Sequence, residues 1–143
     1  MPEVTISDVM KEYAAGAVKY AKRTRGVNLD YSESSLDEID KILIALSAPA
    51  RPDPARMTTA EKDELWVFCK MIGGYVGEVI IRCIGGEWMT KSTGEKSSAV
   101  VLKVAGGKVE GSPPESVWRT LTEPDRSIAS YYRGLKALID LQG

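Results

Sequence analysis

The sequence predicts an α+β fold, with about five helices around a central apolar helix and a small two- or three-stranded antiparallel sheet on one side. Two observations support this prediction. Residues 65–84 are apolar around almost the whole helical circumference, which is typical of a helix that its neighbours bury. After the glycine pair at 85–86, short β-prone runs alternate with glycine turns, which is typical of an antiparallel meander.

Length and composition predict one globular domain that spans residues 1–143. Nineteen basic and 20 acidic side chains give a formal net charge of −1, so the chain as a whole has no electrostatic attraction for nucleic acid or an anionic membrane. Charged residues interrupt the longest apolar run, and the N-terminus lacks the pattern of a signal peptide. We therefore expect a cytoplasmic protein without a membrane or nucleic-acid partner.

The absence of histidine excludes several kinds of chemistry. Without imidazole there is no Ser-His-Asp or Cys-His catalysis and no usual zinc site. The sequence therefore predicts no metal, no cofactor and no catalytic residue. Enzymes that use carboxylate, lysine or tyrosine remain open, although the composition disfavours an enzyme.

The two cysteines do not predict a disulfide. Cys69 and Cys83 lie on the same predicted helix, about 21 Å apart along its axis. A disulfide needs Cα atoms within about 7 Å. Both residues fall on the apolar side of the helix, so we expect two buried, unpaired thiols.

The first two helices are predicted from apolar periodicity and from their ends. The first spans residues 7–25, and its basic last turn followed by glycine is what the helix dipole and a C-terminal cap favour. These cations are therefore explained locally rather than by nucleic acid. The second helix begins among the serines at 32–35, with either Ser32 or a capping box of Ser35 and Glu38 at its start.

The central helix follows a proline-rich surface loop at 47–57 and opens with a capping box of Thr58 and Glu61. An interior glycine costs a helix about 1 kcal/mol relative to alanine. We therefore expect Gly73 and Gly77, four residues apart, to form a groove in which another helix packs closely.

Short strands are predicted at 87–91, 99–104 and 108–110, with turns at 92–97 and 105–107. Ser112, Pro113 and Glu115 then match the N-cap, N1 and N3 positions of a short helix. The last helix is expected to open at 124–125. Its three consecutive residues at 131–133 cannot all point inward, so we expect one tyrosine and the arginine to be exposed.

Glu78 is the first candidate functional residue, because it projects from a mostly apolar helix. Arg82 lies four residues later, in the favourable order for a helical ion pair, so the simplest interpretation is a Glu78–Arg82 bridge. Alternatively, Glu78 lies at the floor of a groove beside Gly74, with Trp88 as a wall, where it could bind a cation or donate a proton. The three tryptophans at 66, 88 and 118 are expected to anchor the core.

Acidic residues gather around the start of the second helix: Asp30, Glu33, Asp37, Glu38 and Asp40. Acids in the first turn and on a solvated face explain this pattern without a function. The alternative is an acidic docking surface for a basic partner protein.

Three motifs in this order resemble a family of small bacterial domains of unknown function. Residues 29–36 read LDYSESSL, residues 74–79 read GYVGEV, and residues 85–88 read GGEW. The resemblance covers about residues 29–90 and implies a small cytosolic bacterial protein of mixed α+β structure. It brings no established activity and no catalytic residue.

Small proteins of this kind often occur as immunity proteins beside secreted toxins. Together with the missing histidine chemistry, the resemblance leads us to expect protein–protein binding, as an immunity-type inhibitor of a toxin. The alternative function is a small-ligand-binding protein or a carboxylate-dependent enzyme that uses Glu78. The sequence leaves a homodimer open.

Overall fold

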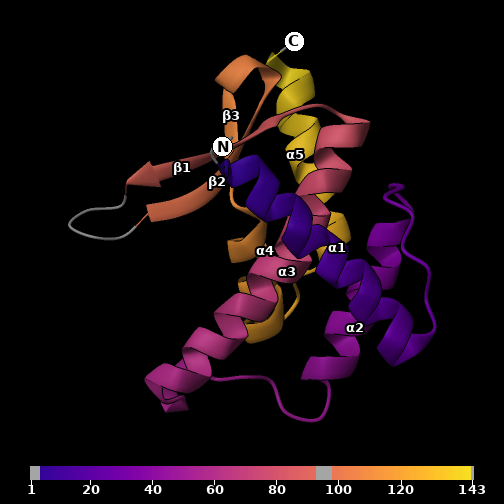
Figure 1. Ribbon diagram of the computed structural model, residues 1–143, viewed down its shortest axis with the longest axis vertical. Helices are drawn as coiled ribbons and strands as arrows, with labels where there is room; N and C mark the ends of the chain where they lie inside the picture. The colour runs from indigo at the N-terminus through magenta and orange to yellow at the C-terminus, as the bar shows by residue number, and fades with distance from the viewer. Residues whose placement is uncertain (1–3, 93–97, 143) are drawn as a thin grey trace.

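A long helix, α3 (Thr59–Cys83), runs through the middle of the molecule, and the other elements pack around it (Figure 1). The computed structural model describes residues 4–92 and 98–142, which form five α-helices and a three-stranded antiparallel sheet. The other elements are α1 (Ile6–Arg25), α2 (Ser35–Ser47), β1 (Glu87–Ser92), β2 (Ser98–Val104), β3 (Val109–Gly111), α4 (Pro113–Thr122) and α5 (Ile128–Gln142). The predicted α+β class is confirmed.

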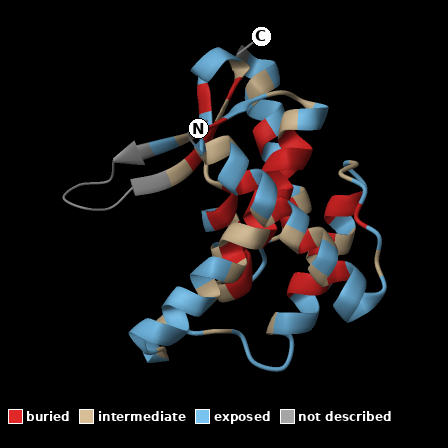
Figure 2. Ribbon diagram, viewed as in Figure 1, coloured by how far each residue is buried: buried red, intermediate tan, exposed pale blue. Residues whose placement is uncertain are grey.

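The start of α3 is fixed by the predicted capping box. The Thr58 hydroxyl accepts a hydrogen bond from the Glu61 amide at 3.1 Å, and the Glu61 carboxylate accepts one from the Thr58 amide at 3.0 Å. The first turns of α3 extend away from the body of the protein and are exposed (Figure 2). Burial is continuous only over residues 72–80, so the expectation that neighbours bury the apolar stretch 65–84 is wrong at its start, where Trp66 and Val67 are exposed, and at its end, where Arg82 and Cys83 are exposed.

Three glycines in the buried half of α3 allow three different elements to approach its backbone. A Cβ on Gly73 would lie 2.5 Å from Pro114 at the start of α4, and a Cβ on Gly74 would lie 3.0 Å from the Met10 carbonyl oxygen of α1. A Cβ on Gly77 would lie 2.0 Å from the Trp88 ring of β1. Gly73 and Gly77 therefore do not share one groove for a single helix, as the sequence led us to expect.

The sheet reaches α3 through Trp88, while its strands β1, β2 and β3 lie against α1, α4 and α5. Its strand order is β1-β2-β3, with Trp88 opposite Leu102 and Val104 opposite Val109. These four side chains are all buried, which fixes the register because a shift by one residue would turn them to the other face. The 92–97 turn falls almost entirely outside the described residues.

At the start of α2, the predicted alternative with Ser32 is confirmed and the box of Ser35 and Glu38 does not form: the Ser32 hydroxyl accepts a hydrogen bond from the Ser35 amide at 3.2 Å. The last helix begins at Ile128, later than expected, because its first amides are capped from another part of the chain. The Asp40 carboxylate accepts hydrogen bonds from Ile128 N at 2.7 Å and from Ala129 N at 3.0 Å.

The predicted start of α4 is confirmed, and its end is held by the proline-rich loop. The Ser112 hydroxyl accepts from the Glu115 amide at 3.5 Å, with Pro113 in the first turn. At the other end, Arg51 donates to the carbonyl oxygens of Thr120 at 3.2 Å and Glu123 at 2.7 Å. A cation at a helix C-terminus satisfies carbonyl groups that have no partner within the helix.

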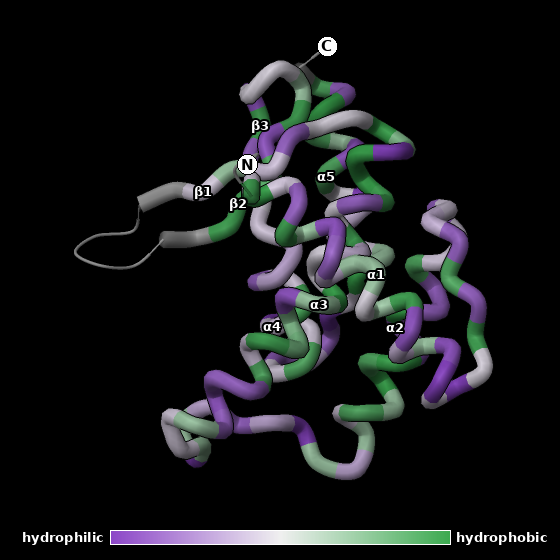
Figure 3. The backbone as a smooth tube through the Cα atoms, in the orientation of Figure 1, coloured by the Kyte–Doolittle hydropathy of each residue, from purple (hydrophilic) through white to green (hydrophobic). Residues whose placement is uncertain are grey.

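Both cysteines are free, as predicted, but only Cys69 is buried. Cys83 is exposed at the last turn of α3, which corrects the expectation that both thiols are internal. Apolar side chains are also exposed at the end of α2, where Ile44 and Leu46 lie in a hydrophobic stretch of the chain (Figure 3). Within the described residues, no helix combines the length and apolarity that crossing a membrane requires.

We expect Gly77→Ala to lower the free energy of unfolding by about 1–3 kcal/mol, because the new methyl group would overlap the Trp88 ring and force α3 and β1 apart. Urea denaturation followed by circular dichroism measures this change. Gly134→Ala is the matched control, since a Cβ at this position in α5 meets nothing within 4 Å. It should be neutral or stabilise by up to about 1 kcal/mol. Equal effects of the two substitutions would contradict the close approach at Gly77.

Candidate functional site

Glu78 lies inside the protein, where α3 meets β1. Its side chain is 3% exposed, and Trp88 Nε1 donates a hydrogen bond to Glu78 Oε2 at 2.8 Å. Trp88 is also 3% exposed, and its ring lies directly against the backbone of Gly77. The predicted groove beside Gly74 is filled by α1, so Glu78 is enclosed rather than presented to a ligand.

Arg82 does not form the expected ion pair with Glu78. Its guanidinium instead stacks on the Tyr31 ring, with 3.7 Å between Arg82 Cζ and the ring centroid. This geometry is a cation–π contact. Burial raises the pKa of Tyr31, and the positive charge of Arg82 opposes that rise. The contact fastens the loop before α2 to the last turns of α3.

Tyr75 joins the same two regions from the inside. Its hydroxyl accepts a hydrogen bond from the Tyr31 amide at 2.8 Å and shares another with the Ser35 hydroxyl at 2.6 Å. The rings of Tyr31 and Tyr75 also contact each other, with centroids 4.8 Å apart. Residues from the three sequence motifs therefore form two hydrogen-bonded groups inside the fold: Tyr31, Ser35 and Tyr75 in one, and Glu78 and Trp88 in the other.

The predicted acidic surface is partly used within the fold. Asp30 Oδ1 accepts hydrogen bonds from the Ser32 hydroxyl at 2.6 Å and the Ser32 amide at 3.1 Å, which lower the pKa of Asp30. Glu33 accepts a hydrogen bond from the Tyr132 hydroxyl and forms an ion pair with Lys136 at 3.5 Å. The Tyr132 hydrogen bond and the Lys136 charge both lower the pKa of Glu33. Asp30 therefore stabilises the turn before α2, and Glu33 connects that turn to α5.

The remaining acids on α2 differ in how far they are engaged. Asp40 caps α5, as described above, and Glu38 forms an ion pair with Lys41 at 3.1 Å. Asp37 is exposed and makes no side-chain hydrogen bond or ion pair with the other described residues. The structure thus leaves Asp37 as the least engaged acid of the predicted docking surface.

A pair of tryptophans forms a second candidate site, which we call the indole surface: Trp66 and Trp118, with Lys62, Asp63 and Glu115 at its edge. The two rings meet edge to face with centroids 6.0 Å apart. Trp66 is 36% exposed and Trp118 is half-buried, so only Trp88 anchors the core in the way predicted for all three tryptophans. A shallow hollow of about 410 Å³ lies over this pair.

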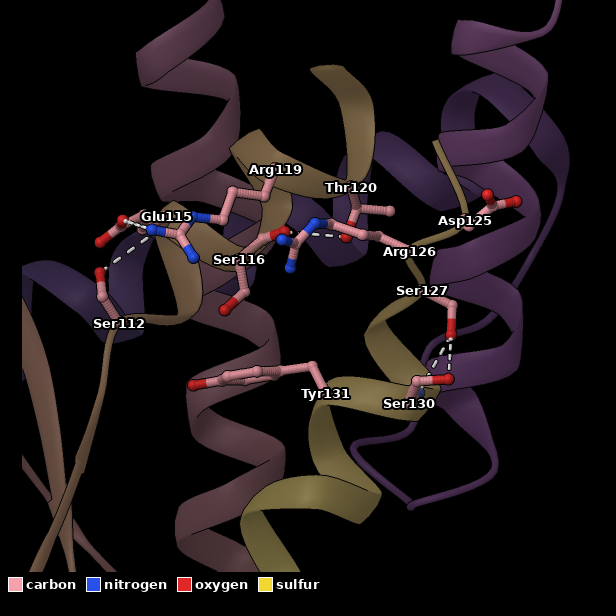
Figure 4. Close-up of a pocket in the computed structure, with 10 residues that line it drawn as sticks. All are labelled: Ser112, Glu115, Ser116, Arg119, Thr120, Asp125, Arg126, Ser127, Ser130 and Tyr131. Atoms are coloured by element: carbon pink, nitrogen blue, oxygen red, sulfur yellow. Dashed lines mark hydrogen bonds and ion pairs between the residues drawn. The ribbon is translucent and has the colours of Figure 1, made fainter. Parts of the chain in front are cut away.

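A third candidate site is a cavity of about 490 Å³ between α4 and the start of α5 (Figure 4). Its ten lining residues all have polar side chains: five carry aliphatic hydroxyls, two are arginines, two are acids and one is a tyrosine. Ser112, Ser116 and Thr120 follow one another at steps of four, which places them on one face of α4. This site was not predicted from the sequence. The spacing of the hydroxyl residues can be read in the sequence, whereas the packing of α5 beside α4 cannot.

Tyr131 forms one wall of this cavity, and its hydroxyl group is unusual. The oxygen is buried and makes no hydrogen bond within the described residues, a situation that costs about 1–3 kcal/mol. It lies against Gly111, where a Cβ would be 2.6 Å away. Burial raises the pKa of Tyr131, while the nearby Ser116 hydroxyl acts in the opposite direction. The expectation that one of the two tyrosines is exposed is wrong, because Tyr132 is buried and Tyr131 is half-buried; Arg133 is exposed, as expected.

Comparison with protein-family models found none that matches this chain. Comparisons with curated proteins and with solved structures also gave no significant match. The resemblance to small bacterial domains therefore stays a prediction. Within the described residues, no group of three or more cysteine and acidic side chains is arranged to hold a metal ion.

We expect Trp88→Phe to lower the free energy of unfolding by about 2–4 kcal/mol, because it removes the hydrogen bond to the buried Glu78 carboxylate and leaves a small cavity. Urea denaturation at neutral pH measures the loss. In a Glu78→Gln background the loss should be smaller, because a neutral amide oxygen is less costly to leave without a donor. Trp66→Phe is the control, and we expect it to change stability by less than about 0.5 kcal/mol. Equal losses at Trp88 and Trp66 would contradict a role for the hydrogen bond.

The Glu33–Tyr132 contact predicts a pH dependence of stability. A carboxyl group whose pKa is lowered by folding stabilises the protein above its unfolded pKa, about 4.3, and this stabilisation is lost as the pH falls through the folded pKa. The stability difference between the wild type and Tyr132→Phe should therefore shrink between about pH 5 and pH 3. Urea midpoints across this range measure it. Tyr20→Phe should give a constant offset, and a constant offset for Tyr132→Phe would contradict the contact.

Proposed function

We propose that this protein acts by binding another protein, and that the indole surface is its contact site. The observation that carries this proposal is the partly exposed pair formed by Trp66 of α3 and Trp118 of α4. The first turns of α3, just before Trp66, extend away from the body of the protein (Figure 2). Tryptophan is enriched among the residues that dominate binding energy at protein interfaces. Here the two rings already pack against each other, so little side-chain freedom remains to be lost on binding.

The edge of the indole surface indicates the chemistry of the partner. Its charged side chains are one lysine and two acids, Lys62, Asp63 and Glu115. Glu115 forms an ion pair with Arg119 at 2.8 Å, whereas Asp63 makes no ion pair with the other described residues. An apolar side chain flanked by a basic group would complement this arrangement. We therefore propose a basic partner, the same kind of partner that the acids of α2 would suit.

The acids of α2 give a second candidate contact on the same partner. Asp30, Glu33 and Asp40 have hydrogen-bonding roles inside the fold, and this leaves Asp37 and Glu38 as the residues to test. Charge reversal at these two positions should weaken binding to a basic partner if α2 takes part. The indole surface is favoured because its apolar centre supplies affinity, whereas exposed charges at a rim chiefly affect the association rate.

We propose further that the protein works in the cytoplasm as an immunity-type inhibitor and that the bound partner is a toxin whose working surface it occludes. The resemblance to small bacterial domains motivates this finer proposal. The rival proposal, an enzyme or ligand-binding protein that uses Glu78, would need a ligand to reach a carboxylate that is 3% exposed and bonded to Trp88. The enclosed position of Glu78 weighs against that rival.

We expect Trp66→Ala to weaken binding of the partner by about 30-fold or more, since a central tryptophan contributes about 2 kcal/mol or more at an interface. The partner is to be isolated from the native cell on the immobilised wild-type protein, identified by mass spectrometry and purified. Its affinity for each variant is then measured by calorimetry. If the partner is the product of a neighbouring toxin gene, its activity in the presence of each variant provides a second measurement.

Val67→Ala is the matched control, because Val67 is 50% exposed on the same turn of α3 but is not part of the indole surface. Asp63→Lys should weaken binding to a basic partner, and by more at low salt than at high salt. Unchanged affinity of Trp66→Ala would remove the indole surface from the proposal. A protein that captures only a second copy of itself would point instead to a homodimer, for which Ile44 and Leu46 offer an exposed apolar patch.

A further inference from the structure

We propose that the cavity between α4 and α5 binds a small molecule through an oxyanion, either a phosphate or a carboxylate group, which Arg119 and Arg126 hold. This site is separate from the contact proposed for a partner protein and shares only Glu115 with it. Its volume of about 490 Å³ is within the range of small-molecule sites.

The two arginines have N–H groups that remain available to a ligand. Arg119 uses Nη2 for Glu115 at 2.8 Å, and Arg126 uses Nε for Glu123 at 2.9 Å. A guanidinium carries five N–H donors in a planar fork that matches phosphate and carboxylate oxygens. In Figure 4 both guanidinium groups lie on the α4 side of the cavity, near Ser116. Each keeps N–H groups that no other described residue accepts.

The hydroxyl groups of the cavity divide into two sets. Those of Ser112 and Thr120 are occupied, because they donate to the carbonyl oxygens of Val100 and Ser116. The Ser116 hydroxyl lies close to the Tyr131 hydroxyl without a well-formed hydrogen bond to it. The Ser130 hydroxyl accepts from Ser127 and Arg133 without donating to another described residue. Ser116 and Ser130 therefore offer protons from two sides of the cavity.

Tyr131 provides the independent observation. Its hydroxyl lacks a hydrogen-bond partner although it is buried, which is rare in folded proteins. The group lies on the wall between Ser116 and Gly111, and a ligand oxygen seated beside Ser116 would satisfy it after a small rotation of the ring. A neutral donor of this kind suits an oxyanion because it adds a hydrogen bond without adding charge.

The two acidic residues of the cavity affect how tightly it should bind an anion. Glu115 competes with the ligand for Arg119, whereas Asp125 lies at the far end of the cavity from that pair in Figure 4. Removing the Glu115 charge should therefore tighten binding of an anion. Substitution of a residue that only maintains the fold would not raise the affinity for an anion. Glu115→Gln therefore distinguishes an effect on binding from an effect on stability.

Calorimetric titration of the purified full chain with inorganic phosphate, and separately with succinate, tests the site. We expect saturable binding of at least one probe below about 10 mM. Arg126→Gln and Arg119→Gln should each weaken it by about 10-fold or more, and Glu115→Gln should strengthen it. Tyr131→Phe should weaken it less, because that substitution removes one neutral donor. Arg56→Gln changes an exposed arginine that pairs with Asp53 and lies outside the cavity; it is the control and should bind as the wild type does.

The two probes distinguish the source of the oxyanion. Binding of phosphate alone points to a phosphorylated ligand, binding of succinate alone to a carboxylic acid, and binding of both supports the shared oxyanion chemistry. The absence of saturable binding for either probe, or equal affinity of the wild type and Arg126→Gln, would overturn the proposal. Unfolding midpoints of all variants show that they remain folded. The assay contains no partner protein, so its outcome is independent of the indole surface.

Discussion

The fold depends on how closely three elements approach the backbone of α3. Gly73, Gly74 and Gly77 lie within one and a half turns, and they admit the start of α4, the middle of α1 and the ring of Trp88. In each case the neighbouring element lies closer to the α3 backbone than a side chain at the glycine would allow. Each contact therefore fixes the distance and the rotation of that element relative to α3. The weak helix propensity of glycine is offset here by packing that no larger residue permits.

The same packing explains why the polar residues of the three sequence motifs do not form an accessible binding site. The three segments are far apart along the chain, yet their polar side chains meet behind the surface, where Tyr75 joins Tyr31 to Ser35 and Trp88 joins Glu78. Buried polar groups of this kind stabilise a fold only when they are paired, and they then favour one packing over its competitors. The groups available for binding lie elsewhere, on the indole surface and around the cavity between α4 and α5.

Whether a feature of this protein could be predicted from the sequence depends on how far apart along the chain its interacting residues lie. The caps at Thr58 and Ser112 were predictable because both partners lie within three residues, and the alternating strands were predictable because they depend on local periodicity. Asp40 was assigned to a surface because the helix it caps begins 88 residues later. Arg82 was paired with Glu78 because it is the nearest cation along the helix, whereas the partner it has in the fold, Tyr31, comes from a loop.

The candidate sites show the same limit. Each half of the cavity is visible as a spacing of hydroxyl and basic residues, but its volume exists only because α5 is anchored beside α4. The chain contacts that produce this placement are the Asp40 cap on α5 and the Arg51 contacts at the end of α4. Neither has a local signature, since the two partners come from different parts of the chain.

The position of Pro114 has a consequence for how the chain folds during synthesis. The synthesis of α3 is complete at Cys83, but Pro113 and Pro114, which pack against Gly73, are synthesised later. At about 5–20 residues per second, the ribosome takes roughly 2–6 s to reach them. During this interval α1 can already cover the Gly74 side, while the opposite apolar flank stays bare. The nascent chain therefore passes through a stage that is open to chaperones, and to misassembly, before α4 closes it.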